Sequence, residues 1–167
     1  MKKILSGFIL LLTFSIHIYA KPLWQATQTG MTVEQVQKIF PDASKQIAKP
    51  ETTLGTGAQQ LLKLDMYKIG ANYYEARFYF FPKKGLSQVT LTLLHGQNSD
   101  AAYDSLVNGF RAKYGQEAKS KEDRVSSEKI WVTKEKSSIE LSLIANYLSI
   151  IYNTNNVDDD RLDLDKI

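Results

Sequence analysis

Apolar and polar positions alternate along several short runs of this chain, and that alternation predicts β-strands. The clearest run is residues 86–94, where the apolar Val89, Leu91 and Leu93 alternate with the polar Gln88, Thr90 and Thr92. Two similar runs precede it, at residues 60–68 and 73–81, and only short turns separate the three. Short turns join antiparallel neighbours, so the three runs predict an antiparallel meander. The residues expected on its core face are Leu62, Leu64, Met66, Tyr74, Ala76, Phe78, Phe80, Val89, Leu91 and Leu93.

A first helix is expected to begin at Thr32, because a threonine followed three residues later by Gln35 makes a capping box. Apolar residues on the helical period follow, and Pro41 ends the helix. Residues 41–58 then carry proline, glycine and threonine with little periodicity. A connection of this length is either functional or contains a short element of its own.

A second helix is expected between Ser99, as its N-cap, and Gly115, which favours a helix end. A charged loop follows, and then three more strand patterns, at residues 129–133, 137–144 and 147–153. The order is a helix and three strands, then a helix and three strands again, which suggests a pseudo-repeat of two similar halves. Helices with one apolar stripe beside strands with one apolar face predict a two-layer α+β domain whose antiparallel sheet has about six strands.

Both ends of the chain differ from this pattern. Residues 1–20 have a basic start, an apolar run and Ala20 at a suitable cleavage position, as in a signal peptide. An uncleaved membrane anchor is the alternative, but polar residues interrupt the run, which is shorter than the roughly 20 apolar residues of a spanning helix. We therefore predict a bacterial periplasmic or secreted protein with one domain over residues 21–157 and an acidic tail over residues 158–167.

Charge and cysteine content narrow the possible functions. The chain has 21 basic and 18 acidic residues, and two of the lysines belong to the predicted signal peptide, so the mature protein is nearly neutral. That balance gives no indication of nucleic-acid binding. The chain has no cysteine, which excludes disulfides and zinc sites built on thiolates. We expect no nucleic-acid partner and no cofactor.

Candidate catalytic groups are few. Residues 126–129 match the motif Ser-x-x-Lys, but the chain lacks the Ser-Asp-Asn and Lys-Thr-Gly elements that accompany it in enzymes. His95 lies near Ser99 and Asp100 in the sequence, and a hydrolase would need all three to converge in a pocket; the alternative is a surface or capping histidine. The acidic tail lacks the glycine and the final glutamate of a calcium-binding loop. The sequence therefore predicts neither catalytic residues nor a metal site.

The strand at residues 73–81 carries aromatic residues on both of its faces. One face is needed for the core. On the other face Arg77 lies among tyrosines, and Tyr and Arg are enriched where proteins bind proteins. The alternative is that these aromatic residues only stabilise the sheet, because aromatic residues favour strands and pair across them. The candidate binding residues are Tyr67, Tyr73, Arg77, Tyr79, Phe81 and Tyr147.

The first helix also carries a family resemblance. Gly30, Met31 and Thr32 precede a helix that bears Val36 and ends at Pro41. This pattern resembles the SmpA/OmlA outer-membrane-assembly lipoproteins and the β-lactamase-inhibitor-protein-like domains, which are small bacterial envelope proteins. The resemblance implies an antiparallel sheet and protein binding through the sheet face or the loops. The chain lacks the lipidated cysteine of the first group and the disulfides of the second, so it implies neither outer-membrane assembly nor β-lactamase inhibition.

These observations favour a non-catalytic exported domain that binds an envelope or extracellular protein through an aromatic and charged sheet face. A carrier of a small apolar ligand or lipid is the alternative, with the aromatic faces and residues 41–58 enclosing a pocket. A small hydrolase that uses His95 is a third hypothesis.

Overall fold

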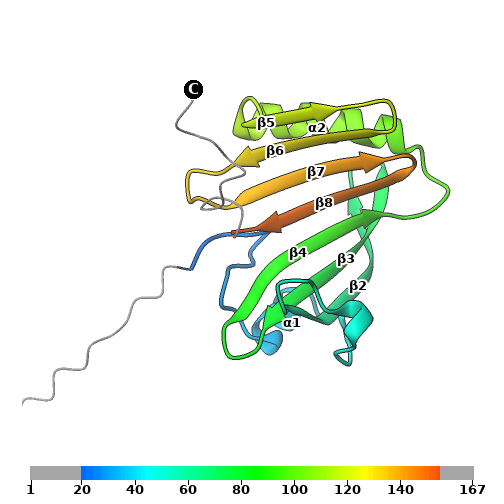
Figure 1. The fold of residues 1–167 in the computed structure, drawn as a ribbon. Coiled ribbons are helices and arrows are strands. Elements are labelled where there is room, and N and C mark those ends of the chain that lie inside the picture. Colours follow the sequence, from blue (N-terminus) through cyan, green and yellow to red (C-terminus); the bar gives the residue numbers. More distant parts are fainter. Residues whose placement is uncertain (1–19, 155–167) are drawn as a thin grey trace, which may run out of the picture.

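One sheet of eight antiparallel strands forms most of the structure (Figure 1). The computed structural model describes residues 20–154, so the predicted signal peptide, except Ala20, and the acidic tail lie outside the described residues. The strands run across the sheet in the order β1-β2-β3-β4-β8-β7-β6-β5. The strands are β1 (Ser44–Lys45), β2 (Gln59–Ile69), β3 (Asn72–Phe81), β4 (Gly85–Leu93), β5 (Lys119–Glu122), β6 (Ser126–Val132), β7 (Ser138–Ile144) and β8 (Tyr147–Asn153), and the helices are α1 (Val33–Ile39), the 3-10 helix η1 (Pro50–Thr52) and α2 (Ser99–Tyr114).

The prediction of a two-layer α+β domain with an antiparallel sheet agrees with this architecture, but the prediction of about six strands is wrong. The two additional strands, β1 and β5, form the two edges of the sheet. All of their residues are exposed, so neither strand shows an apolar alternation, and β5 is charged, which protects an edge from pairing with other chains. The predicted repeat of a helix and three strands is not confirmed, because four strands follow each α-helix in the described residues and η1 lies only among the first four.

The start of α1 follows the sequence prediction. The Thr32 hydroxyl accepts a hydrogen bond from the Gln35 backbone N–H at 3.3 Å, and the Thr32 N–H donates to the Gln35 side chain at 2.8 Å. This capping box satisfies backbone groups that a helix start leaves without partners. It also sets the direction in which α1 presents the fully buried Val36 to the core.

The start of α2 differs from the prediction by one residue. The N-cap is Asn98, whose side-chain oxygen accepts the Ala101 N–H at 3.0 Å, whereas Ser99 is the first helical residue and is buried. Asparagine and serine are equally good N-caps, so the local sequence did not distinguish them. Gly115 ends α2 as predicted, with a φ of 84° that favours glycine.

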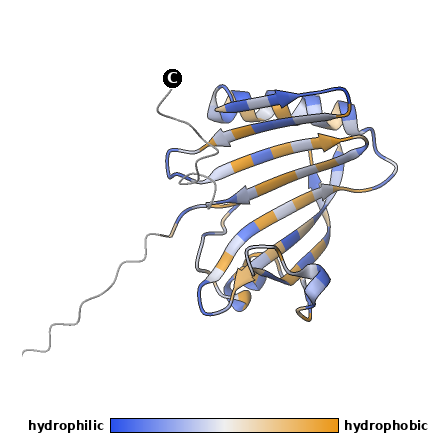
Figure 2. Cartoon of the chain, viewed as in Figure 1, coloured by the Kyte–Doolittle hydropathy of each residue, from blue (hydrophilic) through white to orange (hydrophobic). Residues whose placement is uncertain are grey.

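A single apolar core lies between the sheet and the two α-helices. Buried residues of α1 and of α2 belong to the same cluster as the inward-facing residues of the strands, so both helices pack on one side of the sheet. At the α1 end the Trp24 ring stacks on Phe40 at 5.1 Å, and Phe40 contacts Phe78 of β3 with ring centroids 5.3 Å apart. Apolar and polar residues alternate along the strands, as Figure 2 shows, which gives the sheet one face for the core and one free of helices.

A bulge in β2 reverses two of the sequence predictions. Leu64 pairs with Ala76 but Tyr67 pairs with Tyr74, so β2 contains one residue more than β3 between these pairs. Beyond an extra residue the side chains of a strand change faces. Met66, predicted in the core, is 62% exposed, and Tyr67, predicted on the outer face, lies in the core with its ring 4.6 Å from that of Trp24.

The glycine and methionine that precede α1 fasten the N-terminal segment to the sheet. The Gly30 N–H donates to the Leu86 carbonyl at 2.9 Å, and the Leu86 N–H donates to the Met31 carbonyl at 2.8 Å. A Cβ atom on Gly85 would collide with the Gly30 backbone, so only glycine permits this approach. These bonds place the segment that carries Trp24 against the helix side of the sheet.

Candidate functional site

The outer face of the sheet, which we define as the side opposite α1 and α2, is open in residues 20–154 (Figure 1). A set of ion pairs lies on β2 and β3, toward one edge of this face. Lys63 lies 2.6 Å from Asp65 and 3.6 Å from Glu75, and Arg77 lies 2.6 Å from the same Glu75. The predicted charged residues are therefore largely neutralised by one another.

Tyr73 and Tyr147 lie at the same end of this face, where β3 and β8 begin. The Tyr147 side chain is 52% exposed, and its hydroxyl lies 3.2 Å from the hydroxyl of Thr92 on β4. Tyr73 is 39% exposed, and the Lys68 ammonium lies 5.7 Å from the centre of its ring. These two tyrosines are the candidate residues that a partner reaches most directly.

Other exposed apolar side chains gather at the same end, and we call this group the apolar rim. Six large apolar side chains are exposed in residues 20–154, and five of them belong to the rim. Ile144 pairs with Tyr147 across the β7–β8 turn, and the Ala145 N–H donates to the Val125 carbonyl, so these three rim residues are neighbours. Met66 and Tyr73 lie on β2 and β3, on the other side of β4. The rim residues are Met66, Tyr73, Val125, Ile144 and Tyr147, and the sixth residue, Ile47, lies in the loop after β1.

The remaining candidate residues do not join the rim. Tyr79 is only 7% exposed, and burial raises its pKa although Arg77 opposes the change. Burial alone would lower the pKa of Arg77, but Glu75 outweighs that effect and keeps the guanidinium charged. Phe81 is half-buried at the opposite end of β3, and Tyr67 lies on the other side of the sheet.

A cavity of about 690 Å³ adjoins the rim and contains His95. Ile144 and Tyr147 form one of its walls, and the loop before α2 forms the other. Ser99 and Asp100 also line it, but no hydrogen bond among the described residues joins His95 to either of them. The structure therefore brings the three groups near one another without the linked contacts of a catalytic triad.

The Ser-x-x-Lys motif is engaged in structural contacts. Lys129 donates to Glu122 at 2.6 Å and to Ser120 at 2.8 Å, and the Ser126 hydroxyl donates to Asp123 at 2.7 Å. Burial lowers the pKa of Lys129, but Glu122 outweighs that effect and raises it, so the lysine stays protonated. A protonated lysine cannot accept a proton from a serine, and this motif does not form a nucleophile and base pair.

No group of three or more His, Cys, Asp or Glu side chains in residues 20–154 is placed to hold a metal ion. No described helix is long and apolar enough to cross a membrane.

Comparison with known proteins found no match. No family model matches the chain, and neither a curated protein nor a solved structure is significantly similar to it.

Sequence reasoning missed one feature altogether, a groove between α2 and the segment that carries Trp24. Lys113, Tyr114 and Tyr152 meet there, from a helix end and from the last strand. The sequence did contain one indication of this groove: Tyr74 and Tyr152 lie on the core faces of their strands. A tyrosine hydroxyl there needs a polar partner, whereas an aliphatic side chain would not.

Proposed function

We propose that this protein is a non-catalytic, exported domain that recognises a protein partner through the outer face of its sheet. The observation that carries the proposal is the apolar rim, because most of the exposed large apolar side chains in residues 20–154 lie at one end of that face. Exposed apolar side chains gathered in one area are typical of interaction sites.

The apolar rim and the ion pairs contribute to partner binding in different ways. Tyr147 and Tyr73 offer large rings with polar tips, the kind of side chain that most often dominates binding energy. The cavity beside Tyr147 offers room for a side chain of the partner. Lys63, Glu75 and Arg77 carry charges of both signs, which favours a partner with a complementary alternation of charges.

The exported location rests on the composition of residues 1–20. It places the partner in the bacterial envelope or outside the cell. N-terminal mass analysis of the protein recovered from periplasm and medium tests this part, and a chain that begins at Met1 and stays in the membrane fraction contradicts it.

Site-specific photocrosslinking tests the rim. A photoreactive phenylalanine replaces Tyr73 or Tyr147 in the full chain, and Ile47, which is 83% exposed and lies outside the rim, serves as the control position. We expect one crosslinked protein of defined mass at the two rim positions and none at position 47.

Competition makes the result specific. An excess of unlabelled protein should abolish the crosslink, whereas the variant Ile144→Asp with Tyr147→Asp should fail to compete, with an apparent affinity reduced at least about thirtyfold. The same product at position 47, or equal competition by the rim variant, would show that the rim is not the site.

A second candidate function, the carrier of an apolar ligand, is supported by the groove on the helix side.

A further inference from the structure

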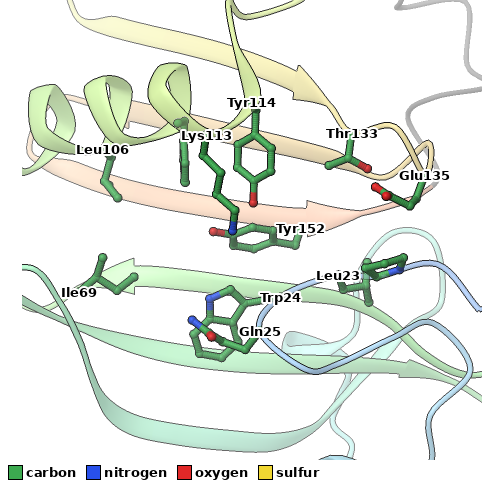
Figure 3. A pocket seen from close by; sticks show the side chains of 12 residues that line it. Leu23, Trp24, Gln25, Ile69, Leu106, Lys113, Tyr114, Thr133, Glu135 and Tyr152 are labelled. Atoms are coloured by element: carbon green, nitrogen blue, oxygen red, sulfur yellow. The ribbon is translucent and has the colours of Figure 1, made fainter.

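The groove lies on the side of the sheet opposite the apolar rim, between α2 and two segments that face it (Figure 3). One part, of about 500 Å³, separates α2 from residues 22–25. A second part, of about 220 Å³, separates α2 from the β2–β3 hairpin. The two parts share four lining residues, so they form one continuous groove along α2. The shared residues are Ile69, Leu106, Phe110 and Lys113.

Apolar side chains and one glycine give the groove its form. Leu106 and Phe110 form the α2 wall, and Trp24 lies on the opposite wall, where Phe40 and Tyr67 hold it. Gly109 leaves the second part open, because a Cβ atom placed there would meet nothing within 4 Å. Groove residues on α2 run from Ala102 to Tyr114, which corresponds to about 18 Å of helix.

Polar groups without partners meet inside this apolar groove. Figure 3 shows Lys113 and Tyr114 reaching from α2 toward Tyr152 on β8. Tyr152 is only 6% exposed, and neither its hydroxyl nor those of Tyr74 and Tyr114 makes a hydrogen bond with any residue in the described range. None of these three hydroxyl oxygens is fully buried, so each is accessible from the groove and can donate a hydrogen bond to a ligand that enters it.

All of these groups can donate protons to hydrogen bonds. Burial raises the pKa of Tyr74 to about 12 and also raises the pKa of Tyr152, so both hydroxyls stay protonated. The Lys113 ammonium lies 5.0 Å from the centre of the Tyr114 ring, and no carboxylate in residues 20–154 forms an ion pair with it. Glu135 is the only acidic residue in the groove lining. A ligand that completes these contacts has an anionic head group.

We propose that the groove binds a single-chain anionic amphiphile, whose acyl chain lies along Leu106 and Phe110 and whose head group lies at Lys113 and Tyr152. The head group is a carboxylate or a phosphate, because either accepts hydrogen bonds from an ammonium and from tyrosine hydroxyls. The apolar walls exclude a free inorganic anion, which would lose its hydration without an apolar gain. The lysine and the tyrosine hydroxyls, in turn, give no advantage to an uncharged alkane.

Calorimetric titration of the purified full chain tests the proposal. The probes are decanoate and decyl phosphate, with 1-decanol as the uncharged analogue and with acetate and inorganic phosphate as head groups alone. We expect saturable one-to-one binding of at least one anionic amphiphile, about tenfold weaker binding of decanol, and no binding of acetate or inorganic phosphate.

A charge variant separates head-group recognition from general affinity for apolar chains. Lys113→Gln should weaken binding of the anionic probe about tenfold and leave decanol unchanged, whereas Lys119→Gln on β5 removes an equal charge outside the groove and should change neither. Equal affinities for the anionic probe and decanol, or an equal effect of the two lysine variants, would refute the anionic head group.

A volume variant tests the location of the chain. Gly109→Leu fills the second part of the groove and should weaken every amphiphile at least about tenfold, while Gly109→Ala should weaken them far less. Both changes favour helix formation at this position, so a loss of folding does not explain the result. Unchanged binding by Gly109→Leu, or no binding of any probe to the parent protein, would overturn the proposal. Crosslinking at the rim is a separate readout, and its success or failure does not depend on these titrations.

Discussion

The polar groups on the two sides of the sheet differ in whether they have partners within the protein. On the outer face Lys63, Glu75 and Arg77 are paired with one another, and the Tyr147 hydroxyl has Thr92. In the groove on the helix side, the hydroxyl of Tyr152 and the ammonium of Lys113 have no such partner among the described residues. Lys63, Glu75 and Arg77 are half-buried, whereas Tyr152 is buried and Lys113 is exposed.

This difference separates stability from recognition. Exposed ion pairs contribute about 0 to 1 kcal/mol each, so the outer face can be altered at little cost to the fold. Residues on the helix side belong to the core or to buried ion pairs. Replacing one of them with a smaller residue leaves a cavity in closely packed structure, which lowers the free energy of unfolding. Substitutions should therefore affect stability strongly on the helix side and partner binding strongly on the outer face.

The largest loss of stability is expected from Trp24→Ala. The Trp24 ring stacks on Phe40 and meets Tyr67 edge-on, and it is only 3% exposed, so its removal should cost about 3 to 5 kcal/mol of unfolding free energy. Urea unfolding of the parent and of the variant measures the change. Trp24→Phe keeps an aromatic ring and should cost clearly less. A loss below about 1 kcal/mol for the alanine variant would mean that this segment is not part of the core.

Lys129→Ala is expected to come next. The Lys129 side chain is only 7% exposed and lies 2.6 Å from Glu122 and 3.5 Å from Glu117. Its removal leaves a nearly buried carboxylate with fewer partners and should cost about 2 to 4 kcal/mol. Lys129→Met removes the charge but keeps most of the volume of the side chain. The difference in unfolding free energy between the two variants therefore measures the contribution of packing. If the alanine variant is as stable as the parent in urea, the ion pairs beneath α2 do not stabilise the fold.

A smaller effect is expected from acid. Hydrogen bonds from Arg111 chiefly lower the pKa of Glu117 to about 2, from an ordinary value of 4.5. A carboxyl with a lowered pKa stabilises the fold fully above the ordinary value and loses that contribution as pH falls toward the folded value. The Arg111 side chain is 41% exposed, so solvent screens this pair, and we expect a loss of about 1 to 2 kcal/mol between pH 4.5 and 2.

The variant Glu117→Gln isolates this contribution. It cannot ionise, so its unfolding free energy should vary less with pH in that window than the parent's, by the same 1 to 2 kcal/mol or so. Glu128→Gln, on the outer face of β6, is the control for a change of one charge. Parallel pH profiles for the parent and Glu117→Gln would contradict the assignment to Glu117.

The smallest effect on stability is expected on the outer face. Arg77→Leu removes a half-exposed partner of Glu75, but Lys63 remains 3.6 Å from that carboxylate, so the cost should stay below about 1 kcal/mol. Partner crosslinking at position 147 should fall in the same variant although the fold is intact. A large loss of stability without any loss of crosslinking would contradict the idea that the outer face serves binding more than stability.

How far the sequence predicted the structure depended on the range of the interaction. The capping box at Thr32 and Gln35 involves residues that are neighbours in the chain, and it was predicted correctly. The faces of Met66 and Tyr67 were predicted wrongly, because the extra residue in β2 is defined only by its pairing with β3. The edge strand β5 was missed because a strand exposed on both faces has no apolar alternation to read.

The candidate binding site shows the same limit. The sequence identified Tyr73 and Tyr147 as outer-face residues, but it did not show that they lie at one end of the sheet beside Ile144 and Val125. That grouping depends on β8 returning beside β4, which is a pairing between distant parts of the chain. The groove depends on it as well, because it joins Trp24, α2 and Tyr152.

By itself the sequence determined the class of fold, the helix boundaries to within a residue and the two faces of most strands, because caps, turns and apolar periods act between close neighbours. Only the tertiary structure decided where the outer face offers a rim and where the helix side leaves a groove. Both arise where segments far apart in the chain pack together, and the fit between them depends on bulges, on Gly85 and on Gly109 rather than on any local pattern.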